Sequence, residues 1–181
     1  MTNRWIVTAM GQDRPGIVAG VTKVLYRLGC NLEDSAMTRL EGEFAVMLIF
    51  SSSVRMSEEA LRTAFAPLER QLKLLVHLKR LTKPETGAPH KEGKPYLISV
   101  YGADRPGIVF RVSEELARTG INITDVHTHR SAGKGPPLYL LLLEVELPPR
   151  VTAESFEGRL KKLGQSLGVE VSLRPSEAEI L

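Results

Sequence analysis

Apolar and polar positions follow the same order twice along the chain. The runs Arg4 to Met10 and Pro95 to Tyr101 are apolar, β-branched or aromatic and end at a glycine, which predicts two strands. Apolar residues then recur with helical spacing, and Gly29 and Gly120 end the two predicted helices. The helical pattern consists of Ile17, Val18, Val21, Val24, Leu25 and Leu28 in the first half, and of Ile108, Val109, Val112 and Leu116 in the second.

The remainder of each half predicts two more strands around a second helix. In the first half a strand from about Leu32, a turn at 41–43 and the apolar run FAVMLIF precede an amphipathic helix and the strand LKLLVHLKRL. In the second half a glycine-rich loop, 131–137, precedes LYLLLLEVEL, a helix and the strand VEVSL. Pro67 lies inside the first of these helices and is expected to kink or shorten it.

The order βαββαβ, given twice, predicts an α+β fold of two ferredoxin-like domains. Each domain would be a four-stranded antiparallel sheet with both helices on one face. We expect domains at 1–81 and 96–175, a linker at 82–95 and a C-terminal tail at 176–181. The linker sequence TKPETGAPHKEGKP is rich in proline, glycine and polar residues, as linkers are.

The two halves are copies of one unit. A shift of 91 positions aligns the segments that start at Gly11 and Gly102, with 14 identities in 29 positions and no gap. Two copies are too few for a solenoid, so duplication of a domain is the simpler interpretation. The identities fall at Gly11, Asp13, Arg14, Pro15, Gly16, Ile17, Val18, Val21, Leu25, Arg27, Gly29, Asn31, Asp34 and Arg39.

The third strands, FAVMLIF and LYLLLL, are apolar on both faces. A sheet with one face in water should alternate apolar and polar residues. The pattern therefore predicts that another domain or another chain covers the open face, and we expect a homo-oligomer or an intimate domain pair.

Composition limits the classes of function. The formal net charge of +3 is too small to indicate nucleic-acid binding, and the single cysteine, Cys30, excludes an internal disulfide framework. The sequence has no signal-peptide pattern and no apolar run of about 18 residues. We therefore expect a cytoplasmic protein that binds neither nucleic acid nor membrane.

The turn Asp13-Arg14-Pro15-Gly16, repeated at 104–107, is the most specific feature. It is open to two interpretations. As helix-start punctuation, the acid suits the positive helix end and the proline suits the first turn. As a ligand site, the glycine lets a carboxylate approach the free N–H groups of the helix, and Asp13 pairs with an ammonium group. Asn31 and Asn122 can donate and accept hydrogen bonds to an amino acid, or can act as turn formers.

A helix of about 14 residues would separate each turn from its asparagine by roughly 20 Å. One domain cannot place both around one small ligand. If both contact the same molecule, the Asp13 turn must meet Asn122, or Asn31 of another chain, and the Asp104 turn must meet Asn31 or its counterpart. The hypothesis predicts that changes at Asn31 and Asp104 damage the same site.

These motifs resemble the ACT domain, a regulatory module that typically binds amino acids at domain interfaces. The resemblance rests on the Asp-Arg-Pro-Gly turn, the endings Gly-Cys-Asn-Leu and Gly-Ile-Asn-Ile, and the duplicated βαββαβ order. The arrangement of two such domains is similar to the glycine cleavage system transcriptional repressor family. That family implies a small amino acid, glycine or serine, and a protein partner such as a DNA-binding transcription factor. The ligand contacts implied by the resemblance are Gly11, Asp13, Arg14, Gly16, Asn31, Gly102, Asp104, Arg105, Gly107 and Asn122.

Other functions have weaker signals in the sequence. An enzyme is not expected, because no nucleophile elbow, phosphate-binding loop, dinucleotide fingerprint or zinc helix occurs, and we predict no catalytic residue, cofactor or metal. His127 and His129 alternate on a strand and could share a metal, but a third ligand is not evident. The chain could instead be a ligand-free interaction module, or a remnant or relative of the regulatory domain of formyltetrahydrofolate deformylase.

Overall fold

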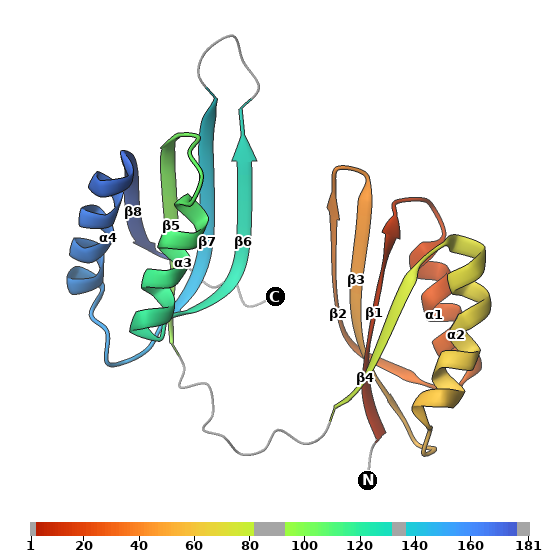
Figure 1. Ribbon diagram of the computed structural model, residues 1–181. Coiled ribbons are helices and arrows are strands. Elements are labelled where there is room, and N and C mark those ends of the chain that lie inside the picture. Colours follow the sequence, from red (N-terminus) through yellow and green to blue (C-terminus); the bar gives the residue numbers. More distant parts are fainter. Residues whose placement is uncertain (1–2, 82–92, 132–136, 177–181) are drawn as a thin grey trace. The chain divides into compact units, whose positions relative to one another are not determined.

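The computed structural model describes residues 3–81, 93–131 and 137–176, in two compact units that divide between Gly87 and Ala88. Unit 1 has its strands in the order β2-β3-β1-β4, all antiparallel, and both of its helices cover the same face of the sheet (Figure 1). This arrangement confirms the predicted ferredoxin-like order. The elements of unit 1 are β1 (Asn3–Gln12), α1 (Ile17–Arg27), β2 (Asn31–Leu40), β3 (Glu43–Ser52), α2 (Glu58–Leu72) and β4 (Leu75–Leu81).

Unit 2 repeats this topology, with the antiparallel strand order β6-β7-β5-β8 and both helices on one face of the sheet (Figure 1). Its elements are β5 (Lys94–Ala103), α3 (Ile108–Thr119), β6 (Asn122–Arg130), β7 (Leu138–Leu147), α4 (Ala153–Leu167) and β8 (Val169–Pro175). Lys94 and Pro95, expected in the linker, are the first residues of β5. Residues 82–92 of the expected linker, 132–136 of the expected loop and 177–181 of the expected tail lie outside the described residues.

Each unit has its own core between the sheet and its two helices. In β1 the alternate residues Trp5, Val7 and Ala9 are buried, as the twofold repeat of a strand requires. In α1 the residues Ile17, Val21 and Leu25 are buried at intervals of four, which is the inward stripe of a helix. The equivalent residues of α3 are buried in unit 2: Ile108, Val112 and Leu116.

Helix α2 continues through Pro67, so the expected shortening at this proline is wrong. The hydroxyl of Ser57 accepts a hydrogen bond of 3.1 Å from the Ala60 N–H and caps the start of the helix. Leu61 is buried before the proline, and Leu72 packs against the core after it. Burial on both sides of Pro67 therefore offsets the hydrogen bond that the proline cannot donate.

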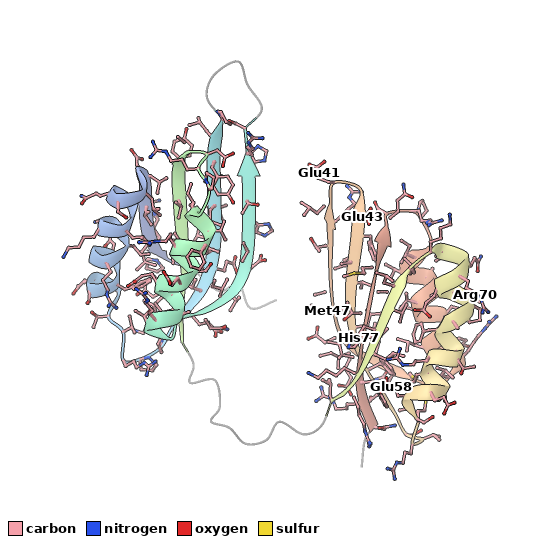
Figure 2. The ribbon with its side chains drawn as sticks, in the orientation of Figure 1. Glu41, Glu43, Met47, Glu58, Arg70 and His77 are labelled. Atoms are coloured by element: carbon pink, nitrogen blue, oxygen red, sulfur yellow. The ribbon has the colours of Figure 1, made fainter. Side chains whose placement is uncertain are left out.

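The sheet face opposite the helices carries apolar side chains in both units. Met47 of β3 lies on this open face (Figure 2) and is 48% exposed. Its neighbours include Met10 in unit 1, and Tyr101 and Leu138 occupy the same face in unit 2. The predicted two-sided apolar character of the third strands is thus present in the fold. No helix of the described part is long and apolar enough to cross a membrane.

Candidate ligand-binding turns

The glycine of each Asp-Arg-Pro-Gly turn has a backbone conformation that other residues rarely adopt. Gly16 has a φ angle of 96° and Gly107 one of 95°, and each is the N-cap of the helix that follows. A Cβ atom at either position would meet nothing within 4 Å. Glycine is therefore required by the backbone angle and not by crowding, and the space in front of the helix is open.

The helix starts behind these glycines carry no side-chain cap. Neither α1 nor α3 has a capping hydrogen bond from a side chain or an acidic residue in its first turn. Helix α2 of the same unit differs, because it has Ser57 as cap and Glu58 and Glu59 in its first turn. The N-terminal ends of α1 and α3 therefore keep N–H groups and a positive dipole end that suit an added carboxylate.

Each turn is fastened to the hairpin formed by the second and third strands of its unit. The Asp13 N–H donates a hydrogen bond of 2.8 Å to the Gly42 carbonyl, and the Asp104 N–H donates one of 3.0 Å to the Pro137 carbonyl. These backbone hydrogen bonds hold both aspartates at the same place in their units.

Both aspartate side chains pair with an arginine at the end of an edge strand of the same unit. Arg39 Nη1 lies 3.3 Å from Asp13 Oδ2, and Arg130 Nε lies 2.8 Å from Asp104 Oδ2. Arg39 and Arg130 were not among the predicted site residues. Their signal was present in the sequence, because Arg39 is the last identity in the aligned repeat.

The arginines of the turn point to the end of the second helix. Arg14 Nη2 donates a hydrogen bond of 2.6 Å to the Leu72 carbonyl, at the last residue of α2. Arg105 lies against the glycine that ends α4, since a Cβ atom on Gly168 would be 3.1 Å from Arg105 Nη1. Both guanidinium groups thus lie at the negative end of a helix, which stabilises the fold.

The glycines that precede each turn permit close packing. A Cβ atom on Gly11 would lie 3.0 Å from Leu74 Cδ2, and one on Gly102 would lie 2.8 Å from Val169 Cγ1. The absence of a side chain at Gly11 and Gly102 therefore lets the first and last strands of each unit approach.

The two asparagines lie at the opposite end of their units from the turns. In β3, Glu43 pairs with Gln12 beside the turn, whereas Ser51 pairs with Asn31. Eight residues of strand separate these positions, or about 26 Å. The register of unit 2 is equivalent, with Asn122 opposite Glu146 and Ala103 opposite Leu138. One unit therefore does not bring its own turn and its own asparagine together, and both asparagines are exposed.

One of the two histidines of β6, His127, pairs with a carboxylate. His127 Nε2 lies 2.8 Å from Asp125 Oδ2, and the described residues contain no group of three or more His, Cys, Asp or Glu side chains placed to hold a metal ion. Burial raises the pKa of the Cys30 thiol.

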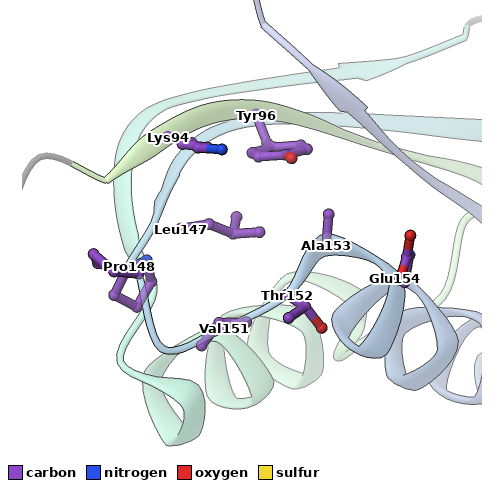
Figure 3. Close-up of a pocket in the computed structure, with 9 residues that line it drawn as sticks. Lys94, Tyr96, Leu147, Pro148, Val151, Thr152, Ala153 and Glu154 are labelled. Atoms are coloured by element: carbon purple, nitrogen blue, oxygen red, sulfur yellow. The ribbon is translucent and has the colours of Figure 1, made fainter.

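Two hollows differ in their relation to the turns. One of about 510 Å³ adjoins the turn of unit 1 and is bordered by Pro15, Gly16, Ala19 and Lys23. Another, of about 430 Å³, lies in unit 2 between Lys94, Tyr96 and the loop before α4 (Figure 3). Lys94 pairs with Leu147 at the far end of the sheet from the turn. None of the predicted site residues lines this second hollow.

Comparison with known proteins identifies the two units. ACT-domain family profiles match residues 3–79 and 96–163. The chain is 27% identical over 174 residues to the glycine cleavage system transcriptional repressor of Escherichia coli, across 93% of this chain and 87% of that protein. It is 33% identical over 73 residues to a UPF0237 protein of Streptococcus pneumoniae, across 40% of this chain and 83% of that protein.

A solved structure supports the fold of the whole chain. An unknown protein from Galdieria sulphuraria aligns with a TM-score of 0.78 at 24% identity, across 98% of this chain and 100% of that one. The profile matches and the shared fold agree with the two turns and the duplicated sheet. The chain belongs to the ACT-domain family and contains two ACT domains in tandem.

Proposed function

We propose that this chain is an amino-acid-binding regulatory protein, and not an enzyme, that controls transcription through a protein partner. The ligand we propose is a small α-amino acid, with glycine or serine as the first choice. One observation carries the proposal: in both units an uncapped helix start, opened by a left-handed glycine, lies beside an aspartate. The proposed location is the cytoplasm.

The chemistry of each turn matches the two charges of an amino acid. The ligand carboxylate accepts hydrogen bonds from the first N–H groups of α1 or α3, and Asp13 or Asp104 accepts from the ligand ammonium. Each aspartate side chain keeps about 30% of its surface exposed, so it can be reached from solvent. The asparagine of the same unit is about 26 Å away along the strand, so the proposal requires an asparagine from a different ACT unit.

The proposed role in transcription is supported by similarity to the Escherichia coli repressor, whose name also gives the glycine cleavage system. We propose a DNA-binding transcription factor as the partner, with no direct contact to nucleic acid. The net charge of +3 agrees with a protein partner better than with DNA.

We also propose that the chain forms homo-oligomers. All ten residues of the edge strand β2 are exposed, and Met37 and Leu40 of this strand are 61% and 72% exposed. An exposed edge strand offers unpaired backbone groups to a neighbour, and exposed apolar side chains add a favourable contact.

Calorimetric titration with glycine, serine and a panel of other amino acids tests the proposal. We expect saturable binding of glycine or serine by the wild-type chain and its loss in the double variant Asp13→Ala/Asp104→Ala. Glu59→Ala, a surface carboxylate change on α2, is the matched control and should leave binding unchanged. Folded wild-type protein that binds no amino acid would refute the proposal.

A ligand-free interaction module is the second candidate. It is favoured by the observation that both aspartates already have an arginine partner, together with the apolar residues of the open sheet faces. A stable fold, no amino-acid binding and a partner that binds with or without amino acids would favour this candidate.

A further inference from the structure

Arg39 and Arg130 pair with the aspartates of both turns, and the predicted site did not include them. We infer that each arginine forms, with its aspartate, a clamp for the charged head group of an α-amino acid. The guanidinium binds the ligand carboxylate together with the helix N–H groups, and the aspartate binds the ligand ammonium. This inference rests on the proposed function and assigns a ligand-binding role to two further residues.

The contacts leave most of each guanidinium available. Arg39 uses Nη1 toward Asp13, whereas Arg130 uses Nε toward Asp104. A guanidinium has five N–H donors in a planar fork, so a carboxylate can bind at an edge that the aspartate does not occupy. Within the described residues, neither arginine has a second hydrogen-bond or ion-pair partner.

Access to the arginines is open. Arg39 and Arg130 lie opposite Phe44 and Tyr139 at the ends of the edge strands β2 and β6, and their side chains are 69% and 66% exposed. The aspartates are less exposed and are held through their backbone N–H groups. A fixed carboxylate beside a reachable cation presents the two charges that an amino-acid zwitterion requires.

Stability alone is a weak reason for this pair to occur in both copies. Exposed ion pairs contribute little to folding, about 0–1 kcal/mol each. The two pairs also use different nitrogen atoms of the guanidinium, while the placement of the cation beside the aspartate is the same. What the copies share is therefore the juxtaposition of charges and not one hydrogen-bond geometry.

The test compares variants that each remove one surface ion pair per unit. Arg39→Ala/Arg130→Ala removes the pairs at the turns, and Arg62→Ala/Arg118→Ala removes the helix pairs with Glu58 and Glu114. Each protein is titrated with glycine, with serine and with glycinamide, which has the ammonium but no carboxylate. Thermal unfolding confirms that each variant is folded.

We expect the turn variant to bind glycine or serine at least tenfold more weakly than the wild type, because charge-assisted hydrogen bonds are lost. The helix variant should bind as the wild type does. The preference of the wild type for glycine over glycinamide should shrink in the turn variant, and Arg39→Lys/Arg130→Lys should restore part of the affinity.

Two results would overturn the inference. If the wild type binds glycine or serine and the turn variant binds equally or more tightly, the clamp is wrong while the proposed function stands. If the folded wild type binds no amino acid, the proposed function fails and the clamp fails with it.

Discussion

The two ACT domains share the backbone of the turn and differ in the surfaces around it. Beside the turn of unit 1, the open face presents Met10 opposite Leu75, and a hollow of about 550 Å³ lies there. The equivalent pair in unit 2 is Tyr101 opposite Glu170. The two copies therefore have the same turn residues but different residues on the open face, and we expect the same ligand chemistry at both turns.

The helices after the turns differ in the same way. Gly20 lets α1 approach α2, because a Cβ atom there would lie 2.6 Å from Leu68 Cδ1. The aligned residue of α3 is Arg111, and the preceding Phe110 is 64% exposed. The spaces in front of Gly16 and Gly107 are thus bordered by different side chains. The two turns should therefore bind the same ligand with different affinities.

The largest expected effect comes from variants that remove the aspartate of one turn at a time. Asp13→Ala should abolish binding at the turn of unit 1, and Asp104→Ala should abolish it at the turn of unit 2, because each removes the acceptor for the ligand ammonium. Calorimetry should show half of the wild-type stoichiometry in each variant, with different residual affinities. Identical loss of all binding in both single variants would show that the turns do not act separately.

The pairing of turns and asparagines sharpens this result. Asn31→Ala should weaken binding at the same site that Asp104→Ala removes. The double variant Asn31→Ala/Asp104→Ala should therefore keep the same stoichiometry as Asp104→Ala. If Asn31→Ala instead behaves as Asp13→Ala does, Asn31 acts with the Asp13 turn of a second copy of the chain.

Substitution of either turn glycine by alanine should destabilise the protein by the same amount. Gly16→Ala and Gly107→Ala each place a side chain at a φ angle near 95° and should cost about 1–2 kcal/mol of the free energy of unfolding. Gly158→Ala is the matched control, because it lies exposed in α4 with nothing within 4 Å of its Cβ position and should stabilise by roughly 0.5–1 kcal/mol. Urea denaturation measures all three, and a neutral Gly16→Ala would contradict the assigned backbone angle.

The arginines of the turns should differ in their effect on stability. Arg14→Ala removes the hydrogen bond to the Leu72 carbonyl and should destabilise unit 1 by about 1 kcal/mol. Arg105→Ala should cost less, because in the described part Arg105 lies close to Gly168 without a hydrogen bond of its own. Chemical denaturation of the two variants tests the order, and an equal or larger cost for Arg105→Ala would contradict it.

The smallest expected effect is a change in how stability depends on pH. A hydrogen bond from Ser51 and the nearby Arg4 lower the pKa of Glu33 from its ordinary value of 4.5, so its contribution is present above that value and is lost as the pH falls through the lowered pKa. The aligned residue in unit 2 is Thr124, which has no such titration. Glu33→Gln should slightly reduce the fall in the free energy of unfolding as the pH is lowered. Urea denaturation between pH 7 and pH 3 measures this, and the same pH profile in the variant and the wild type would contradict the lowered pKa of Glu33.

Much of the fold was accessible from periodicity and the internal repeat, because strand and helix periods are local properties of the sequence. The partners of individual side chains were less accessible. Arg39 meets Asp13 only because the hairpin register returns the end of β2 to the turn, 26 residues along the chain. The position of Arg14 at the end of α2 depends likewise on how the second helix packs. Pro67 does not shorten α2, because core burial on both sides of the proline outweighs its local effect.

The most direct test of the central claim is an amide chemical-shift map of the isotope-labelled chain during titration with glycine and serine. We predict that the largest shifts fall on the amides of Gly16 and Gly107, on the first turns of α1 and α3, and at Arg39 and Arg130. Saturable shifts confined to other regions, such as the hollow between Lys94 and Glu154, or no shifts at saturating ligand, would contradict the claim that these turns bind an amino acid.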